Sequence, residues 1–124
     1  MRWHTQERWK DRLIAEEAAM RKHFPQFVLR LDSGNLCWDG IVEPIPGNLF
    51  HITIRYRDTH PYTEPETWID PPPPPGTPHV YCSGAICIHK QTWDPATGTA
   101  ASLVPLVCGW LTAFVHWQEA GERF

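Results

Sequence analysis

The run of five consecutive prolines, Pro71 to Pro75, constrains the fold of this chain more than any other feature. Proline has no backbone N–H and a fixed φ, so a run of prolines cannot pair within a β-sheet. A sheet formed by the preceding strands must therefore end there. The run could bind an aromatic groove of another domain, but its place between a strand and a cysteine-bearing loop favours a stiff spacer.

Three segments before the prolines alternate apolar and polar residues, as half-buried strands do. They lie near residues 27–31, 36–45 and 49–56 and are separated by the turn sequences Ser33-Gly34-Asn35 and Pro46-Gly47-Asn48. A fourth, edge-like strand is expected around Thr67-Trp68-Ile69. This order predicts an antiparallel meander of four strands, whose second strand is marked by Leu36, Trp38, Ile41 and Ile45.

Helical spacing flanks the meander on both sides. Between residue 5 and about residue 24 one stripe carries Trp9, Leu13, Met20 and Phe24. Thr5 can cap the start of this helix, and Pro25 stops it. From about Thr99 the same spacing recurs at Leu103, Val107, Trp110, Phe114 and Trp117. Pro105 fits this second helix if the helix starts near Ser102 and otherwise predicts a kink. The fold class is therefore α+β.

Length and charge restrict the partners. The chain has 124 residues, 42% of them hydrophobic, which predicts a single domain over residues 1–124 with its own core. The net charge of -3 and the pI near 6.1 argue against nucleic acid as the main partner. Seven of the eleven Lys and Arg nevertheless lie in the first thirty residues, so the first helix has a basic face.

Two further function classes are disfavoured. The longest apolar run near the C-terminus is interrupted by Pro105, Gly109 and Thr112 and is expected to be too short and too mixed to span a bilayer. The four cysteines are irregularly spaced and no signal peptide precedes them. We therefore expect reduced thiols in a cytoplasmic protein without a membrane role.

Cys87 is the strongest candidate for chemistry. It follows a Gly-containing turn and stands between two isoleucines, so it could be the core residue of a short strand, but loop-type residues surround it. A zinc site could be formed from His79, Cys82, Cys87 and His89, but a short strand would point such ligands to opposite faces, and we expect no metal. A protease-like Cys–His pair would need an orienting third group that the sequence does not identify.

The tryptophans divide into two groups. Four lie on the apolar faces of their expected elements and are predicted to pack in the core: Trp38, Trp68, Trp110 and Trp117. Trp93 differs because Asp94-Pro95 follows it directly, which places it in a loop. There it is expected to support the adjacent turn.

The order of helix, meander, proline-bearing crossover, cysteine loop, Trp-x-Pro and helix resembles the ubiquitin-conjugating enzyme family. The matching stretches cover nearly the whole chain. Phe50 to Tyr56 matches the third strand, and His60-Pro61-Tyr62 with Pro65 matches the family's Tyr-Pro-Phe and following proline. The family's His-Pro-Asn and active-cysteine block matches Pro78-His79-Val80-Tyr81 through Gly84 to Ile86-Cys87-Ile88, and Trp93-x-Pro95 with the helix from about Thr99 completes the resemblance. The ordered combination is more specific than any one motif.

The chain departs from that family in three ways. Thr77-Pro78-His79 replaces His-Pro-Asn, so a histidine stands where the family has asparagine. Only 37 residues follow Cys87 (124 minus 87), too few for the family's last two helices. The closing segment, with Trp110, Trp117 and Gly121, is more similar to short bacterial relatives encoded beside antiphage cyclases or in bacterial ubiquitin-like operons.

The resemblance implies a mechanism and a set of site residues. Cys87 would accept the C-terminal glycine of a ubiquitin-like protein or a cyclase as a thioester from an activating enzyme and pass it to a lysine amine, without a metal or nucleotide on this chain. Implied roles are oxyanion donor for His79, close backbone approach for Gly84, loop support for Trp93 and Pro95, and activating-enzyme docking for Arg8, Lys10 and Arg12. The rival hypothesis is an inactive module that only binds the modifier or cyclase. Its usual sign, loss of the cysteine, is absent here.

Overall fold

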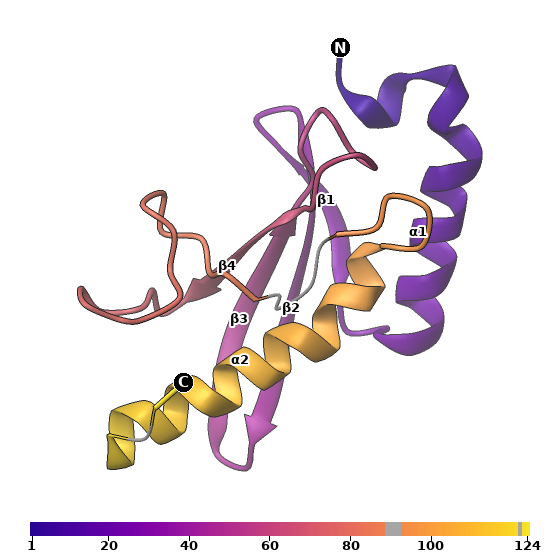
Figure 1. Cartoon of the computed structure of the whole chain (residues 1–124). Helices are drawn as coiled ribbons and strands as arrows, with labels where there is room; N and C mark the ends of the chain where they lie inside the picture. Colours follow the sequence, from indigo (N-terminus) through magenta and orange to yellow (C-terminus); the bar gives the residue numbers. More distant parts are fainter. Residues whose placement is uncertain (89–92, 122) are drawn as a thin grey trace.

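A four-stranded antiparallel sheet forms the centre of the molecule, and two helices accompany it (Figure 1). The computed structural model describes residues 1–88, 93–121 and 123–124. The strands are β1 (Val28–Asp32), β2 (Asn35–Ile45), β3 (Asn48–Arg55) and β4 (Glu66–Asp70), in the spatial order β1-β2-β3-β4. The predicted meander is confirmed, and β4 ends directly before the prolines.

The register of β2 corrects one expectation from the sequence. Leu36 and Trp38 are buried as predicted, but Ile41 is 58% exposed. The inward-facing side of the strand continues through Gly40 and Val42, because successive residues of a strand face opposite sides. The ring of Phe27 lies where a Cβ on Gly40 would be, only 2.7 Å away, so this strand position must be glycine.

The first helix starts later than predicted. Two short 3₁₀ turns, η1 (Trp3–Thr5) and η2 (Glu7–Trp9), precede α1 (Lys10–His23). The hydroxyl of Thr5 donates to the carbonyl of Arg2 (2.9 Å) and does not cap α1. The predicted end is confirmed, since α1 stops two residues before Pro25.

The second helix, α2 (Ala100–Ala120), crosses the face of the sheet, with its start near α1 (Figure 1). Thr99 and Ser102 form a capping box: Thr99 Oγ1 accepts from Ser102 N (3.1 Å), and Ser102 Oγ accepts from Thr99 N (2.9 Å). Pro105 lies inside the helix, so the carbonyl of Ala101 loses its intrahelical N–H donor. The start at Ala100 is two residues earlier than the Ser102 start that best suited Pro105.

The same helix corrects the expectation that the C-terminal apolar run is too short and too mixed to span a bilayer. With 21 residues, α2 is long and apolar enough to cross a membrane by those two measures alone. It nevertheless packs on the sheet: residues such as Leu103, Val107 and Leu111 are almost fully buried, and the Phe114 ring lies 6.3 Å from that of Phe50. Core packing therefore accounts for its apolar character.

The tryptophans follow the prediction with one exception. Trp38 and Trp110 are buried in the core, and Trp117 packs against it. Trp68 lies on the opposite face of β4 from the buried Thr67 and Ile69 and is not part of the core cluster. Its ring instead contacts the segment that carries Cys87.

Candidate functional site

Cys87 lies on a short hairpin that follows the prolines. Val80 and Ile86 form an antiparallel bridge, flanked by hydrogen bonds from Tyr81 N to Ala85 O (2.8 Å) and from Cys87 N to His79 O (2.9 Å). As bridge partners, Val80 and Ile86 share one face of the hairpin. Ile86 is buried, whereas Cys87 is partly exposed.

Glycine is required at the tip of this hairpin. Gly84 N donates to Tyr81 O (2.9 Å) and closes the turn, with Gly84 at φ +99°. A Cβ on Gly84 would also lie 3.0 Å from the Trp68 ring. The left-handed backbone and the close approach to Trp68 both exclude a larger residue. The role in acyl transfer that the resemblance implies for Gly84 stays a prediction.

The sheet holds the hairpin in place. Ile86 N donates to the carbonyl of Thr67 in β4 (2.9 Å), so the segment before Cys87 is bonded to the edge strand. Ala85 and Ile86 are each 2% exposed and anchor the segment. Cys87 is therefore presented from a fixed backbone at the edge of the sheet.

A groove of about 770 Å³ runs between this hairpin and α2. Cys87, Ile88 and Trp93 line it on one side, and the α2 side is lined mainly by small and apolar residues: Leu103, Pro105, Leu106, Gly109, Trp110 and Ala113. A groove of this size accommodates a short extended segment of chain. We call it the α2 groove.

A second groove, of about 680 Å³, lies on the Tyr81 side. Tyr62, Glu66, Tyr81 and Cys82 line it, and we call it the tyrosine groove. Glu64, Ile88 and Trp93 line both grooves. The two grooves therefore meet close to Cys87.

Tyr81 lies near the candidate nucleophile. The Cys87 side chain, burial and the negative charge of Glu64 raise the pKa of Tyr81 to about 12. The phenol therefore remains protonated at neutral pH and acts as a hydrogen-bond donor. The sequence analysis includes Tyr81 in the motif around Cys87 without assigning it a role.

His79 is held mainly through its backbone. It has φ +58°, and its carbonyl accepts from Cys87 N and from Trp110 Nε1 (3.2 Å). Its imidazole Nε2 lies 2.6 Å from the carbonyl oxygen of Phe124, whose ring packs edge-on against it. The imidazole lines the α2 groove together with Cys87. The oxyanion role remains a prediction.

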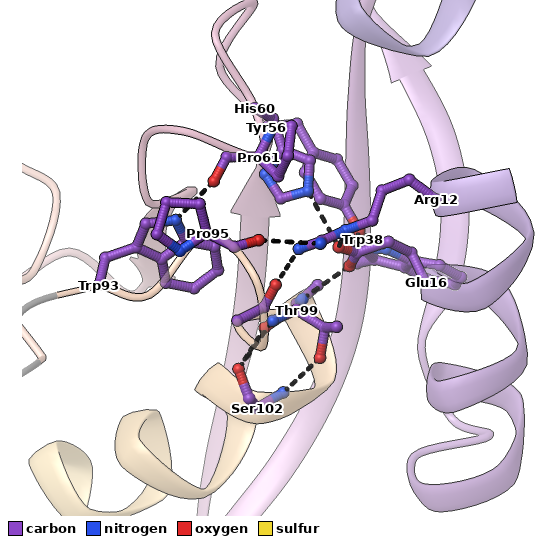
Figure 2. Close-up of polar contacts among 12 residues, drawn as sticks. Arg12, Glu16, Trp38, Tyr56, His60, Pro61, Trp93, Pro95, Thr99 and Ser102 are labelled. Carbon is purple, nitrogen blue, oxygen red and sulfur yellow. Dashed lines mark hydrogen bonds and ion pairs between the residues drawn. The ribbon is translucent and has the colours of Figure 1, made fainter. Parts of the chain in front are cut away.

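Trp93 and Pro95 belong to the loop before α2, as the sequence indicated. Trp93 Nε1 donates to Pro61 O (2.8 Å), and Gly98 packs so closely on the Trp93 ring that a Cβ there would lie 2.5 Å from it. The side chain of Arg12 donates to the carbonyls of Pro95 (3.0 Å) and Gly98 (Figure 2). Trp93 and Arg12 thus hold this loop from two sides.

A buried carboxylate joins α1 to the same region, and the sequence analysis did not find it. Glu16 Oε1 accepts from Tyr56 Oη (2.8 Å) and from the backbone N–H of Ala100 (2.8 Å), while Oε2 pairs with His60 Nε2 (2.9 Å) and Arg12 Nε (3.1 Å). Figure 2 shows these contacts converging between α1, β3 and the start of α2. We call them the Glu16 network.

The network determines the protonation of its members. Burial acts to raise the pKa of Glu16, but hydrogen bonds from His60, Ala100 and Tyr56 outweigh it and lower the pKa below its ordinary value. Burial and the adjacent carboxylate raise the pKa of Tyr56 well above its ordinary value. The carboxylate is therefore held in its charged form within the core.

The three proposed docking cations lie in different environments. Arg8, on η2, and Lys10, at the start of α1, are exposed. The Arg12 side chain is only 17% exposed and is engaged by Glu16, Pro95 and Gly98. Arg12 is therefore part of the internal structure, and of the three proposed docking cations Arg8 and Lys10 are the exposed ones.

The structure describes three of the four candidate zinc ligands: His79, Cys82 and Cys87. His89 lies outside the described residues. Among the residues that the structure describes, no group of three or more His, Cys, Asp or Glu is arranged to hold a metal ion. The expectation that this cluster binds no zinc remains a prediction.

Comparison with known proteins identifies the family of this chain. The chain is one of the E2-like proteins of bacterial antiphage systems, in agreement with the resemblance found in the sequence. The matching family model is that of the type II CBASS E2 protein; it covers residues 16–123, and the chain belongs to this family. A search of curated proteins finds no match.

Proposed function

We propose that this protein is an acyl carrier of the ubiquitin-conjugating type, with Cys87 as its nucleophile. Cys87 accepts the C-terminal glycine of a ubiquitin-like protein or of a cyclase from an activating enzyme, and passes it to a lysine amine. The observation that carries this proposal is the placement of Cys87: a partly exposed thiol on a fixed hairpin, where two grooves meet. Family membership supports the same role.

The α2 groove suits the acyl donor. A chain that ends in glycine has no side chain at the reacting residue, so it can lie close to the backbone of the hairpin. The small residues Gly109 and Ala113 and the apolar Leu106 offer an extended tail a smooth, mostly apolar wall. Fixing the tail there would bring its carbonyl carbon to the sulfur and lower the entropic cost of reaction.

The chemistry balances without a metal or nucleotide on this chain. On loading, the Cys87 thiolate attacks the incoming thioester and releases the thiol of the activating enzyme, a nearly isoenergetic exchange. On transfer, the amine nitrogen bonds to the carbonyl carbon, and the C–S bond breaks to regenerate the thiolate. His79 would donate to the oxygen that becomes negative between these stages.

The proposal includes a docking site for the activating enzyme and a cellular compartment. Arg8 and Lys10 would dock the activating enzyme, because both are exposed on the N-terminal side of the molecule. Substituting either residue alone would then mainly change the rate of association with the activating enzyme and the salt dependence of that rate. The four free thiols suit a reducing compartment, and we propose the cytoplasm.

A synthetic acyl donor tests the proposal without any partner protein. The probe is a short peptide whose C-terminal glycine is activated as a small-molecule thioester. We expect a peptide adduct that thiols reverse, that moves onto free lysine, and that Cys87→Ser converts into a slowly formed, stable oxyester. The matched control is Cys82→Ser, because Cys82 is the exposed cysteine of the same hairpin.

The outcomes separate an enzyme from a binding module. Loading and lysine transfer that persist in Cys87→Ser would refute the assignment of the nucleophile. A peptide that binds the protein but forms no adduct at Cys87 would support the inactive binding module instead. Full loading and transfer in Cys82→Ser would show that Cys82 is not required.

A further inference from the structure

We propose that Phe124 is an intramolecular competitor of the acyl donor. Its ring and its carbonyl occupy the part of the α2 groove beside His79, and a donor tail must displace them before it can lie in the groove and reach Cys87. The inference rests on the proposed function of Cys87 and describes how access to that site is controlled. It follows from the contacts that Phe124 makes with both walls of the groove.

The chain reverses direction after α2. Gly121 adopts a left-handed backbone, φ 68°, and its N–H donates to the carbonyl of Trp117 (3.0 Å), which ends the helix. The end of the chain therefore lies back alongside α2 and not beyond it (Figure 1). This reversal brings the Phe124 ring to 6.0 Å from the ring of Trp117 and 5.3 Å from that of Trp110. Phe124 thus packs on the helix that it follows.

Phe124 also contacts the hairpin, which forms the other wall of the groove. Its ring lies edge-on to the His79 imidazole, with 5.2 Å between the ring centroids, and its carbonyl oxygen lies 2.6 Å from His79 Nε2. Phe124 lines the same groove as Cys87. It therefore bridges the two walls, His79 on one side and Trp110 with Trp117 on the other. A donor tail that enters the groove there must take the place of Phe124.

The hydrogen bond between Phe124 and His79 also occupies a group that the site needs. A carbonyl oxygen can only accept, so His79 Nε2 carries the hydrogen and donates it to Phe124. While that bond is made, this N–H does not point to the oxygen of an acyl group. A donor tail that displaces Phe124 would free the N–H at the moment when the acyl group arrives.

The contacts of Phe124 are weak enough for a ligand to overcome. The residue is only partly buried, unlike the α2 residues Leu103 and Leu111, which are almost fully buried. A single aromatic contact of this kind shifts an equilibrium by about two- to twelvefold. The apparent affinity of a ligand falls by the fraction of the protein that is competent to bind it. Phe124 should therefore weaken the binding of a donor tail by a factor of this order.

Phe124→Ala tests the inference with two forms of one glycine-terminated peptide. The unactivated, fluorescently labelled form measures binding by anisotropy, and the thioester form measures loading of Cys87. Phe124→Ala should bind the unactivated peptide about three- to tenfold more tightly than wild type, and subsaturating thioester should load it faster by a similar factor. Phe124→Leu, which keeps apolar volume but lacks the ring, should show a smaller gain. The matched control is Arg123→Ala, an exposed neighbour that should behave as wild type.

Each outcome decides the question. Tighter binding by Phe124→Ala, at an unchanged melting temperature, supports the inference. Equal affinities would overturn it, and weaker binding would overturn it as well, because Phe124 would then be part of the surface that holds the donor. If Phe124→Ala lowers the melting temperature, Phe124→Leu is judged by the same criteria. If binding tightens but no variant is loaded at Cys87, the proposed function fails while the competition by Phe124 stands.

Discussion

Removing the carboxylate of Glu16 should destabilise this protein more than any other acidic-to-alanine substitution in α1. Glu16 is fully buried and accepts contacts from Tyr56, Ala100, His60 and Arg12. Glu16→Ala leaves those groups without their acceptor inside the core, and breaking a buried, hydrogen-bonded charge pair costs about 3–5 kcal/mol. That loss is a large fraction of the free energy of unfolding of a typical domain.

Glu16→Gln should cost less, about 1–3 kcal/mol, because one side-chain oxygen can still accept from Tyr56 and Ala100. The amide nitrogen would then face Arg12, so part of the network is still lost. Urea denaturation followed by tryptophan fluorescence measures both variants, and the midpoint is interpreted only if the denaturant dependence is unchanged.

The matched control is Glu17→Ala, one residue along the same helix. Glu17 pairs with Arg21 at 3.2 Å, but the Arg21 side chain is 77% exposed. Surface pairs of this kind contribute about 0–1 kcal/mol. If Glu16→Ala were no more destabilising than Glu17→Ala, the Glu16 network would not hold α1 to the start of α2, and the reasoning would be wrong.

Four further predictions concern titration, the hairpin, position 79 and metal. Folding lowers the pKa of Glu16, so the contribution of this carboxylate to the free energy of unfolding is fully present above the unfolded pKa near 4.5. That contribution is lost as the pH falls through the folded pKa. Urea denaturation from pH 7 to 3 should therefore show wild type losing its stability advantage over Glu16→Gln below about pH 4.5. Gly84→Ala should lower stability by about 1–2 kcal/mol, measured by urea denaturation, because of its left-handed backbone; full stability would contradict this. His79→Ala should slow discharge of the preloaded glycyl peptide onto lysine by about a hundredfold, and His79→Asn should restore it; equal rates would remove the imidazole from the mechanism. Protein purified without metal should contain no stoichiometric zinc, and melting on chelation would overturn that expectation.

The sequence predicted the elements well where the pattern depends on neighbouring residues. Alternation, turn residues and the proline run located β1 to β4 within two residues of their observed bounds. Helical spacing located α2, and its end at Gly121 follows from the left-handed backbone there, φ 68°. These signals are local, so they survive without knowledge of the tertiary contacts.

The errors arise where tertiary contacts override local pattern. Thr5 has the residue type of a helix cap, but Trp3, 1% exposed, anchors a 3₁₀ turn there, and α1 begins at Lys10. Ile41 looks like a core residue, yet a glycine precedes it and the Phe27 ring fills the space above that glycine. In both cases packing of a buried aromatic ring, Trp3 or Phe27, overrides the local pattern.

The candidate site was predictable only in part. Cys87, Gly84 and Trp93 were recognised because their motif order is specific. Glu16 was not, because a charged residue on a basic helix looks solvated until His60 and Tyr56 are brought against it by β3 and the loop after it. Arg12 was misplaced for the same reason, since its carbonyl partners are more than 80 residues away in sequence.

At position 79 the backbone explains why a histidine can stand where the ubiquitin-conjugating motif has asparagine. What the hairpin requires there is a carbonyl for Cys87 and Trp110 and a backbone at φ +58°. Asparagine and histidine are among the few side-chain-bearing residues that enter this region readily. A histidine in place of the family's asparagine therefore preserves the support of Cys87 through the backbone, whatever the imidazole contributes to catalysis. Residue 79 must above all adopt this left-handed backbone conformation. His79→Asn should therefore keep both the fold and the loading of Cys87, whereas His79→Ala should also strain the hairpin.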